Sequence, residues 1–200
     1  MKRMQFANSM RAAQRFFVHR AVPAILASIL CACLAYPAQA RECGGAAAQE
    51  AIEVGFSPNG GAEDLVIKAI DSSKKSLRVL AYSFTSKPIA QALVGAAKRG
   101  VDVKVVVDKS QNSERYSSAT FLANMGIPVR VDYQHAIMHS KVIVVDEQSV
   151  ETGSFNYTSS AARRNAENAI VLWNSPKLAA VYIENWNEHW NHSEPYEARD

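Results

Sequence analysis

The stretch HSKVIVVDEQSVETGSFNYTSSAARRNAE, residues 139–167, decides the fold and the site that the sequence predicts. Within it, residues 141–145 are a lysine followed by four β-branched apolar residues, a pattern typical of a buried strand. His139 and Lys141 are two positions apart, so on a strand both side chains leave the same face. We therefore expect a strand starting at His139 that presents an imidazole and an ammonium together.

A second short strand-like run, residues 150–152, leads into a polar turn. Gly153 allows a close approach of the backbone there, and Ser154 and Asn156 follow it, again two positions apart. Glu167 ends the stretch and supplies a carboxylate. We expect these side chains to join the imidazole and the ammonium in one site.

These residue types suit the binding and attack of a phosphate diester. The imidazole of His139 can act as nucleophile or as general acid near neutral pH. The ammonium of Lys141 brings a compact positive charge to the non-bridging oxygens. Ser154 and Asn156 can donate hydrogen bonds to the same oxygens, and Glu167 can accept the proton on the second histidine nitrogen.

The same residues spell HxKxxxxDxxxxxxGSxN, which resembles the signature of the phospholipase D superfamily. The resemblance extends from about Ile52 to about Trp190. It is closest to the small, secreted bacterial endonucleases of that superfamily that carry a single such motif. Asp146 is the motif's aspartate, but it lies five residues beyond Lys141 and so on the opposite face of a regular strand. We therefore expect Asp146 to be a structural or electrostatic partner within the catalytic set.

The resemblance also implies a mechanism and a partner. Single-motif members complete their site by dimerising, so we expect a homodimer in which His139 of one subunit attacks phosphorus and the second His139 protonates the leaving alcohol. Lys141 and Asn156 of both subunits would bind the phosphate oxygens, Ser154 would bond within the site, and Glu167 would orient the histidine. No metal ion and no cofactor are expected to take part in the reaction.

The first 40 residues are predicted to be a signal peptide. Five basic residues and no acidic residue precede an apolar run of 15 residues, Ala21 to Ala35, and an A-x-A cleavage pattern ends at Ala40. The run is shorter than a membrane-spanning helix, although an uncleaved anchor or a lipoprotein site at Cys33 remains an alternative. We expect a periplasmic or secreted protein, cleaved near Ala40.

Cleavage changes the charge and the cysteine count. The whole chain has 22 basic and 19 acidic residues, a net charge of +3. The leader holds five of the basic residues, which leaves 17 against 19, a net charge of −2. Net charge therefore neither supports nor excludes a nucleic-acid substrate, which would need a local positive patch. Cys43 alone would remain of three cysteines, so no disulfide within the chain is possible.

Beyond the leader, strand-like and helix-like patterns alternate. The expected strands are residues 51–56, 76–83, 101–108, 127–131, 139–145, 150–152 and 168–173, and the expected helices are residues 63–73, 88–99, 119–125 and 176–190. This alternation predicts an α/β fold, a mixed β-sheet covered by helices on both faces. We expect a flexible lead-in at 41–50, one catalytic domain at 51–192 and a tail at 193–200.

Other residues carry weaker indications. Tyr82, Ser83, Phe84 and Thr85 lie at the carboxyl end of a strand, where α/β sheets often place ligands, and we expect them to line the substrate site. Arg163 and Arg164 directly follow the motif and are candidates for contact with a phosphate backbone.

The remaining histidines and the tryptophans have ordinary explanations. We interpret His135 as a bystander, and His189 and His192 as packing or surface residues. No CxxC or His/Cys cluster indicates a metal site. The three tryptophans, residues 173, 186 and 190, are expected to anchor the core.

Three functions remain open from the sequence. The preferred one is a nonspecific phosphodiesterase acting on DNA or RNA outside the cytoplasm. The second is a phospholipase D that releases phospholipid head groups. The third is an inactive protein that binds nucleic acid or membranes through a retained phosphate pocket.

Overall fold

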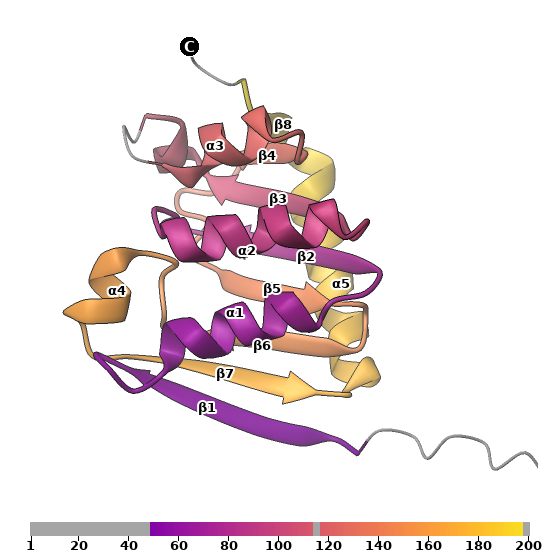
Figure 1. Cartoon of the computed structure of the whole chain (residues 1–200). Coiled ribbons are helices and arrows are strands. Elements are labelled where there is room, and N and C mark those ends of the chain that lie inside the picture. Colours follow the sequence, from indigo (N-terminus) through magenta and orange to yellow (C-terminus); the bar gives the residue numbers. More distant parts are fainter. Residues whose placement is uncertain (1–48, 114–116, 198–200) are drawn as a thin grey trace, which may run out of the picture. The chain divides into compact units, whose positions relative to one another are not determined.

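The computed structural model describes residues 49–113 and 117–197 (Figure 1). The predicted signal peptide, its cleavage site near Ala40 and all three cysteines lie outside the described residues. Among the helices that are described, none combines the length and the apolar character needed to cross a membrane.

Within the described residues, eight strands form one sheet in the order β1-β7-β6-β5-β2-β3-β4-β8. The strands are β1 (Ala51–Ser57), β2 (Ser76–Ala81), β3 (Asp102–Asp108), β4 (Val129–Asp132), β5 (Lys141–Val145), β6 (Ser149–Gly153), β7 (Glu167–Trp173) and β8 (Glu194–Pro195). The helices are α1 (Ala62–Ser72), α2 (Lys87–Lys98), the 3-10 helix η1 (Lys109–Asn112), α3 (Ser118–Asn124), α4 (Ser159–Arg163) and α5 (Pro176–His192).

The sheet is mixed. β2, β3 and β4 run parallel, whereas β5, β6, β7 and β1 follow one another antiparallel from the other side of β2, and β8 is antiparallel to β4. The central strand β5 is buried along its whole length. Its alternating side chains enter both cores, Ile143 and Val145 on one face and Val142 and Val144 on the other, which is why every position is apolar after the lysine.

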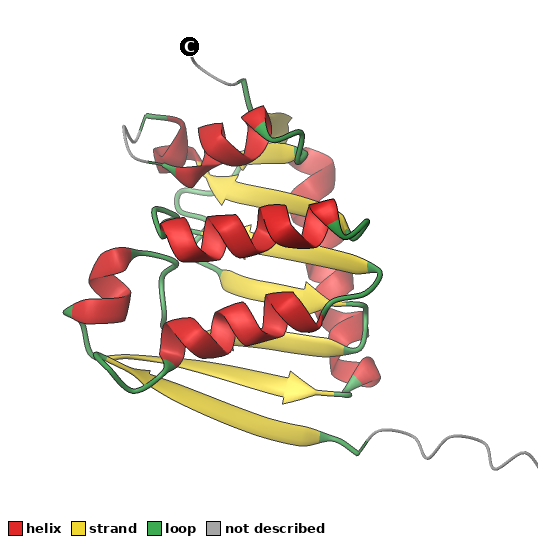
Figure 2. Cartoon of the chain, in the orientation of Figure 1, coloured by secondary structure: helices red, strands yellow, loops and turns green. Residues whose placement is uncertain are grey.

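Helices cover both faces of this sheet, as predicted. α1, α2 and α3 lie on one face and α5 crosses the other (Figure 1, Figure 2). α1 buries Leu65, Val66 and Ile70 against the first face. On the second face Trp186 of α5 is buried, and its indole N–H donates a 3.1 Å hydrogen bond to the carbonyl of Val79 in β2. Two separate cores therefore hold the sheet between them.

Three of the differences from the expected elements affect the site or the sheet. β5 begins at Lys141, so His139 lies in the loop before the strand and not on it. The short helix α4 follows the motif and was not predicted. The segment expected to be a tail contributes β8, whose Glu194 pairs with Val131 of β4. That pairing adds an eighth strand to the sheet beyond the end of α5.

Candidate active site

Four neighbouring strands, β2, β5, β6 and β7, have one end each along the same edge of the sheet, where edge means the row of strand ends and not an outer strand. β2 ends at Ala81, which pairs with Lys141 at the start of β5. β6 ends at Gly153, and β7 begins at Glu167 on its far side. Because neighbouring strands in this part of the sheet are antiparallel, residues far apart in the sequence reach the same edge. The predicted site is assembled there from β2, β5, β6 and β7.

His139 and Lys141 lie together at this edge. The ammonium nitrogen of Lys141 lies 3.0 Å from Nδ1 and 3.2 Å from Nε2 of His139, and it donates a 2.8 Å hydrogen bond to the carbonyl of His139. The imidazole is exposed, whereas Lys141 is buried. Burial lowers the pKa of the Lys141 ammonium, and the negative charge of Glu167 opposes this shift. An accessible imidazole thus lies beside a partly desolvated ammonium group.

Tyr82, which the sequence grouped with Ser83, Phe84 and Thr85 as a candidate substrate contact, is a further member of this group. Its ring centroid lies 4.4 Å from that of His139, with the planes at 49°, and the ammonium of Lys141 lies 5.0 Å from its ring centroid. The backbone N–H of Tyr82 donates to the carbonyl of Ser140 at 2.9 Å. The signal was its place at the end of β2, directly before Ser83.

Gly153 and Ser154 anchor the polar turn. A Cβ at Gly153, whose φ is 155°, would overlap the backbone carbonyl of Asn168. That close approach lets the hydroxyl of Ser154 donate to Oε2 of Glu167 at 2.6 Å while it accepts from the N–H of Asn168 at 3.1 Å. Oε1 of Glu167 accepts from Asn165 at 3.1 Å. In this chain Glu167 therefore holds the turn, and its role in orienting His139 stays a prediction.

Asn156 lies in the loop after this turn. Its Oδ1 is buried and has no hydrogen-bond partner within the described residues. The next residue, Tyr157, fixes the loop, because its carbonyl accepts the N–H groups of Thr85 and Ser86 at 2.9 and 2.8 Å. The segment after β2 is thereby held against the segment after β6. Asn156 retains capacity for a further partner at the site.

Asp146 lies elsewhere. Its carboxylate accepts three backbone hydrogen bonds, from the N–H groups of Lys74, Lys75 and Ser76, at 2.7–2.8 Å. It follows the far end of β5, five residues from Lys141, which is roughly 16 Å along a strand. Its inclusion in the catalytic set is therefore corrected, whereas the expectation of a structural partner matches these contacts.

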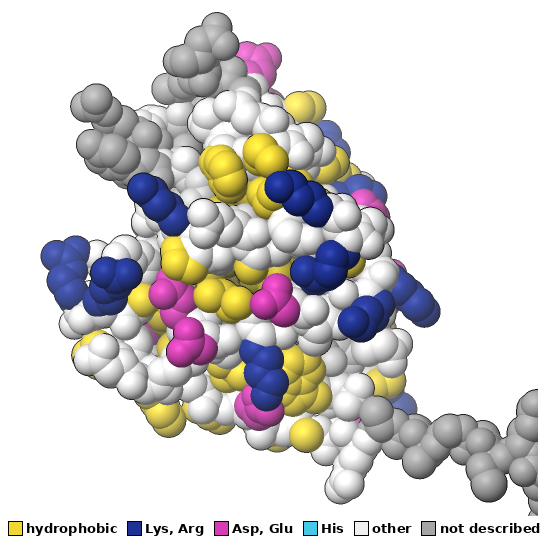
Figure 3. Space-filling model, in the orientation of Figure 1, with side chains coloured by type: hydrophobic (Ala, Val, Ile, Leu, Met, Phe, Trp, Pro, Cys, Tyr) yellow, Lys and Arg dark blue, Asp and Glu magenta, His cyan; other side chains and the backbone are white. Residues whose placement is uncertain are grey.

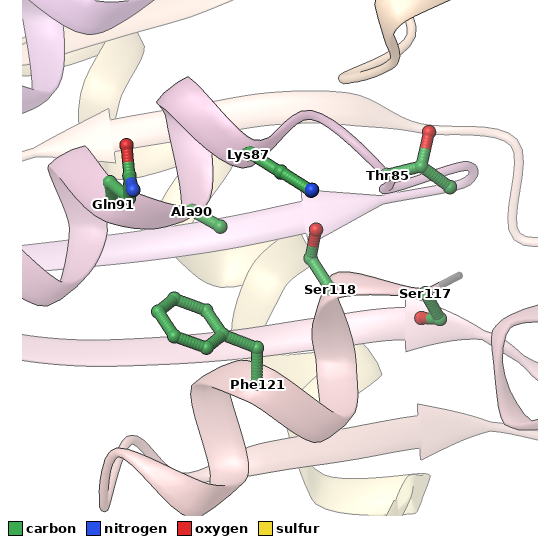
Figure 4. Close-up of a pocket in the computed structure, with 7 residues that line it drawn as sticks. All are labelled: Thr85, Lys87, Ala90, Gln91, Ser117, Ser118 and Phe121. Atoms are coloured by element: carbon green, nitrogen blue, oxygen red, sulfur yellow. The ribbon is translucent and has the colours of Figure 1, made fainter. Parts of the chain in front are cut away.

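The other three residues expected to line the substrate site after β2 fall in different places. Phe84 is fully buried against Tyr157, with ring centroids 5.9 Å apart, so the prediction of a substrate contact for it is wrong. Ser83 is half-buried. Thr85 lines a cavity of ≈ 330 Å³ that lies between α2 and α3 and contains none of the motif residues (Figure 4). Its lining includes Lys87 and Phe121.

Arg163, the last residue of α4, and Arg164, which follows it, are both exposed, and dark blue side chains project from the molecule near α4 (Figure 3). Arg164 donates a hydrogen bond to the hydroxyl of Ser160. Arg163 lines a surface hollow together with Glu63 and Asp64, whose charges oppose its own. A contact of either arginine with substrate stays a prediction.

The fold also brings together residues that the sequence reasoning had treated separately. Asp132 is buried at the end of β4, and its Oδ2 lies 2.9 Å from His135, 2.8 Å from His189 and 3.1 Å from His192. Burial alone would raise the pKa of the Asp132 carboxyl, but hydrogen bonds from the three imidazoles hold that pKa well below its usual range. The interpretation of these histidines as bystander and surface residues is corrected. The sequence did carry a signal for this cluster, in the two three-residue spacings D-x-x-H (residues 132–135) and H-x-x-H (residues 189–192).

The arrangement at the sheet edge supports displacement at phosphorus. An exposed imidazole is placed to attack, an ammonium beside it can neutralise a phosphate oxygen, and a hydroxyl–carboxylate pair braces the adjoining turn. One chain supplies one such histidine within the described residues.

Comparisons with known proteins agree with this chemistry. The profile of the family described as "Cardiolipin synthase, PLD-like domain" matches residues 66–190. The phospholipase D of Rickettsia bellii is 38% identical over 131 residues, covering 66% of this chain and 65% of that protein. The mitochondrial cardiolipin hydrolase of Mus musculus is 28% identical over 65% of this chain and 58% of that protein. The chain thus spans less than two thirds of the length of these relatives.

Solved structures share the fold. The crystal structure of Nuc, a phospholipase D family member from Salmonella typhimurium, has a TM-score of 0.73 and 50% identity, over 74% of this chain and 99% of Nuc. NucT from Helicobacter pylori, at 20% identity and a TM-score of 0.67, shares the fold over 74% of this chain. Because the family profile covers more than half of its residues and half of the aligned positions are identical in Nuc, this chain belongs to the phospholipase D superfamily.

Proposed function

We propose that this protein is an endonuclease that hydrolyses the phosphodiester bonds of DNA, and of RNA, through a phosphohistidine at His139. The observation that carries the proposal is the exposed His139 imidazole 3.0 Å from the buried Lys141 ammonium at an open sheet edge. The match to Nuc, which extends over 99% of that chain, favours an endonuclease. The leader-like first 40 residues support action in the periplasm or outside the cell.

The proposed reaction has two displacements and needs two histidines. His139 of one subunit attacks phosphorus, forming a P–N bond as the P–O bond to the leaving alcohol breaks. The partner's His139 donates a proton to that alcohol and then takes one from water, which attacks the phosphohistidine and releases the phosphate. Lys141 of both subunits balances the oxygen charges, so the chemistry has no step that needs Mg²⁺.

A homodimer is therefore part of the proposal, and an apolar stripe beside the site supports it. Ile52, Val54 and Phe56 alternate along the edge strand β1 and are 64%, 50% and 61% exposed. Phe56 pairs with Asn168, which in turn donates to Ser154. An exposed apolar surface continuous with a half-site fits a two-fold interface between identical chains.

A second candidate is a phospholipase D that releases lipid head groups. The relatives from five Rickettsia strains, at 36–38% identity, carry the name phospholipase D, which favours this candidate. The described residues include no helix that could span a bilayer. The exposed position of His139 suits a lipid head group as well as a long polymer.

One assay separates these candidates. The protein, produced from its full coding sequence, is incubated with plasmid DNA and with phosphatidylcholine vesicles in EDTA, beside a His139→Asn variant. Cleavage of DNA alone supports the endonuclease, and release of choline alone supports the lipase. Binding of either without turnover supports an inactive binding protein. A requirement for Mg²⁺ would refute the proposed chemistry.

A mixing experiment tests the shared site. Wild-type and His139→Asn chains are unfolded together in equal amounts and refolded, so that pairs form at random. If each site needs both histidines, activity falls to about a quarter of that of the wild type, whereas independent sites retain about half. Retention of half the activity, or a strictly monomeric protein at full activity, would contradict the dimeric mechanism.

A further inference from the structure

A carboxylate and three imidazoles form a compact cluster outside the His139 site. Oδ2 of Asp132 is the common centre, and one nitrogen of each imidazole lies 2.8–3.1 Å from it. These four ligand atoms all lie within 4.8 Å of one another. The ring centroids of His135 and His189 are 4.9 Å apart, and those of His189 and His192 are 5.3 Å apart. The imidazoles thus converge on one point.

Three elements build this cluster. Asp132 is the last residue of β4, and its Oδ1 accepts the backbone N–H groups of Gln134 and His135, which fixes the turn that follows the strand. His189 and His192 are three residues apart in the last turn of α5, so they lie on one face of the helix. The ligand atoms are therefore held by backbone contacts and by a regular helix.

Hydrogen bonding alone is a poor account of the geometry. One carboxylate oxygen has two lone-pair directions, yet three imidazoles face the same Oδ2 of Asp132. A cation between the four groups would give each of them its own ligand bond. In a tetrahedral zinc site neighbouring ligand atoms are separated by about 3.3 Å, a spacing that small side-chain rotations would reach from the observed positions.

We propose that Asp132, His135, His189 and His192 bind one divalent transition-metal ion, with Zn²⁺ the best fit. Three imidazole nitrogens and one carboxylate oxygen are a zinc donor set, whereas Mg²⁺ and Ca²⁺ prefer oxygen ligands throughout. Four protein ligands fill a tetrahedral shell, which is the arrangement of a structural site. The metal stabilises the fold and takes no part in the reaction at His139.

The position of the cluster indicates what the metal stabilises. It joins the last turn of α5 to the start of the loop that runs from β4 to His139. The same loop is held by Lys109, which donates to the carbonyl of His135 at 3.0 Å, and by Asp108, which accepts the N–H of Met138 at 2.8 Å. A metal here would close one end of that loop onto the helix.

Metal content is the direct test. The protein is produced from its full coding sequence without a polyhistidine tag, stripped with chelator, dialysed against Zn²⁺ and then against buffer, and analysed by elemental mass spectrometry. We expect about one zinc per chain, with a dissociation constant at or below about 1 μM by calorimetry. Zn²⁺ should raise the Tm by about 5–10 °C when it is present in 100-fold excess over that constant. Mg²⁺ should leave the Tm unchanged.

Two variants make the test specific. His135→Gln/His192→Gln replaces the two more exposed ligands and should lose the zinc and the Tm rise. His139→Asn is the matched control, because it removes an imidazole four residues after His135 that is not a proposed ligand. This variant should keep both the bound zinc and the rise in Tm. If circular dichroism shows that the double variant does not fold, the single variant His192→Gln takes its place. In addition, wild-type crystals are then tested for an anomalous diffraction peak at the zinc absorption edge.

The proposal is overturned if the wild type holds less than about half an equivalent of zinc. It is equally overturned if the double variant binds as much zinc as the wild type, or if the anomalous peak lies elsewhere. Because metal content is measured without any substrate, these outcomes are independent of whether the protein cleaves DNA.

Discussion

The hydroxyl of Tyr157 donates a 2.7 Å hydrogen bond to Oε2 of Glu151, and both side chains are fully buried. Burial raises the pKa of Glu151 to about 8, although the hydrogen bond from Tyr157 opposes the shift. Burial likewise raises the pKa of Tyr157. Because the carbonyl of Tyr157 also holds Thr85 and Ser86, this pair supports the loop that carries Asn156.

The raised pKa of Glu151 predicts a pH-dependent stability. The carboxyl is protonated in the folded chain up to about pH 8 but ionises near its ordinary value of 4.5 when unfolded. Its stabilising contribution is therefore complete below pH 4.5 and is lost as the pH rises through 8, by about 1.4 kcal/mol per pH unit. Glu151→Gln keeps a neutral acceptor for Tyr157 and should remove this slope. Urea unfolding at pH 5 and pH 8 measures it, and identical slopes in the two proteins would contradict the assignment.

Asp146 should be a stability residue and not a catalytic one. Asp146→Ala leaves three backbone N–H groups without their carboxylate, and we expect the free energy of unfolding to fall by about 2–4 kcal/mol. Asp146→Asn can still accept some of these bonds and should lose less. At a temperature where each variant is folded, the turnover rate on plasmid DNA should stay within a few-fold of the wild type. A folded variant that turns over at least 100-fold more slowly would return Asp146 to the catalytic set.

Local sequence predicted the parts of the fold that depend on local patterns. The β-branched run after Lys141 gave a buried strand because such residues fit a sheet covered on both faces. The position of Asp146, five residues further on, correctly separated it from the lysine. His139 is different, because β5 begins at Lys141 and His139 lies before it, although the carbonyl of Ser140 still accepts the N–H of Tyr82 next to β2.

The misses come from contacts between distant segments. Asp132 meets His189 across 57 positions, because α5 packs against the sheet beside β4 and β8 then pairs with β4 beyond the end of α5. Phe84 follows a strand, as ligand-binding residues often do. It is buried because the bridge to Tyr157 turns it into the core. Neither contact produces a repeating pattern of apolar residues from which the sequence could have predicted it.

Tyr82 should position the catalytic pair through its ring. Its ring is tilted by 49° against that of His139, with the centroids 4.4 Å apart, and lies 5.0 Å from the ammonium of Lys141; the hydroxyl is not needed for either contact. Tyr82→Ala should lower kcat by about 10-fold and shift the pH dependence of kcat/KM, because the imidazole loses its packing partner. Tyr82→Phe should restore both to wild-type values. If the phenylalanine variant is as impaired as the alanine variant, the hydroxyl and not the ring is the active group.

Gly153 offers a test of the turn that carries Ser154. A methyl group at this position would overlap the carbonyl of Asn168, so Gly153→Ala must push β6 away from β7 at the site. We expect a loss of about 2–4 kcal/mol in the free energy of unfolding. The proposed cleavage of plasmid DNA should become slower in parallel, because the Ser154–Glu167 hydrogen bond depends on that approach.

Gly95 provides the matched control for this substitution. It lies in the interior of α2, where an added Cβ would meet only the guanidinium of Arg99 at 3.8 Å. Gly95→Ala should therefore stabilise the chain by up to about 1 kcal/mol through helix propensity and leave cleavage unchanged. The two alanine variants add the same methyl group, so a difference in unfolding midpoint and in plasmid cleavage between them isolates the contact at Asn168. Equal behaviour of the two would mean that β6 and β7 tolerate separation at the site and that the turn does not govern activity.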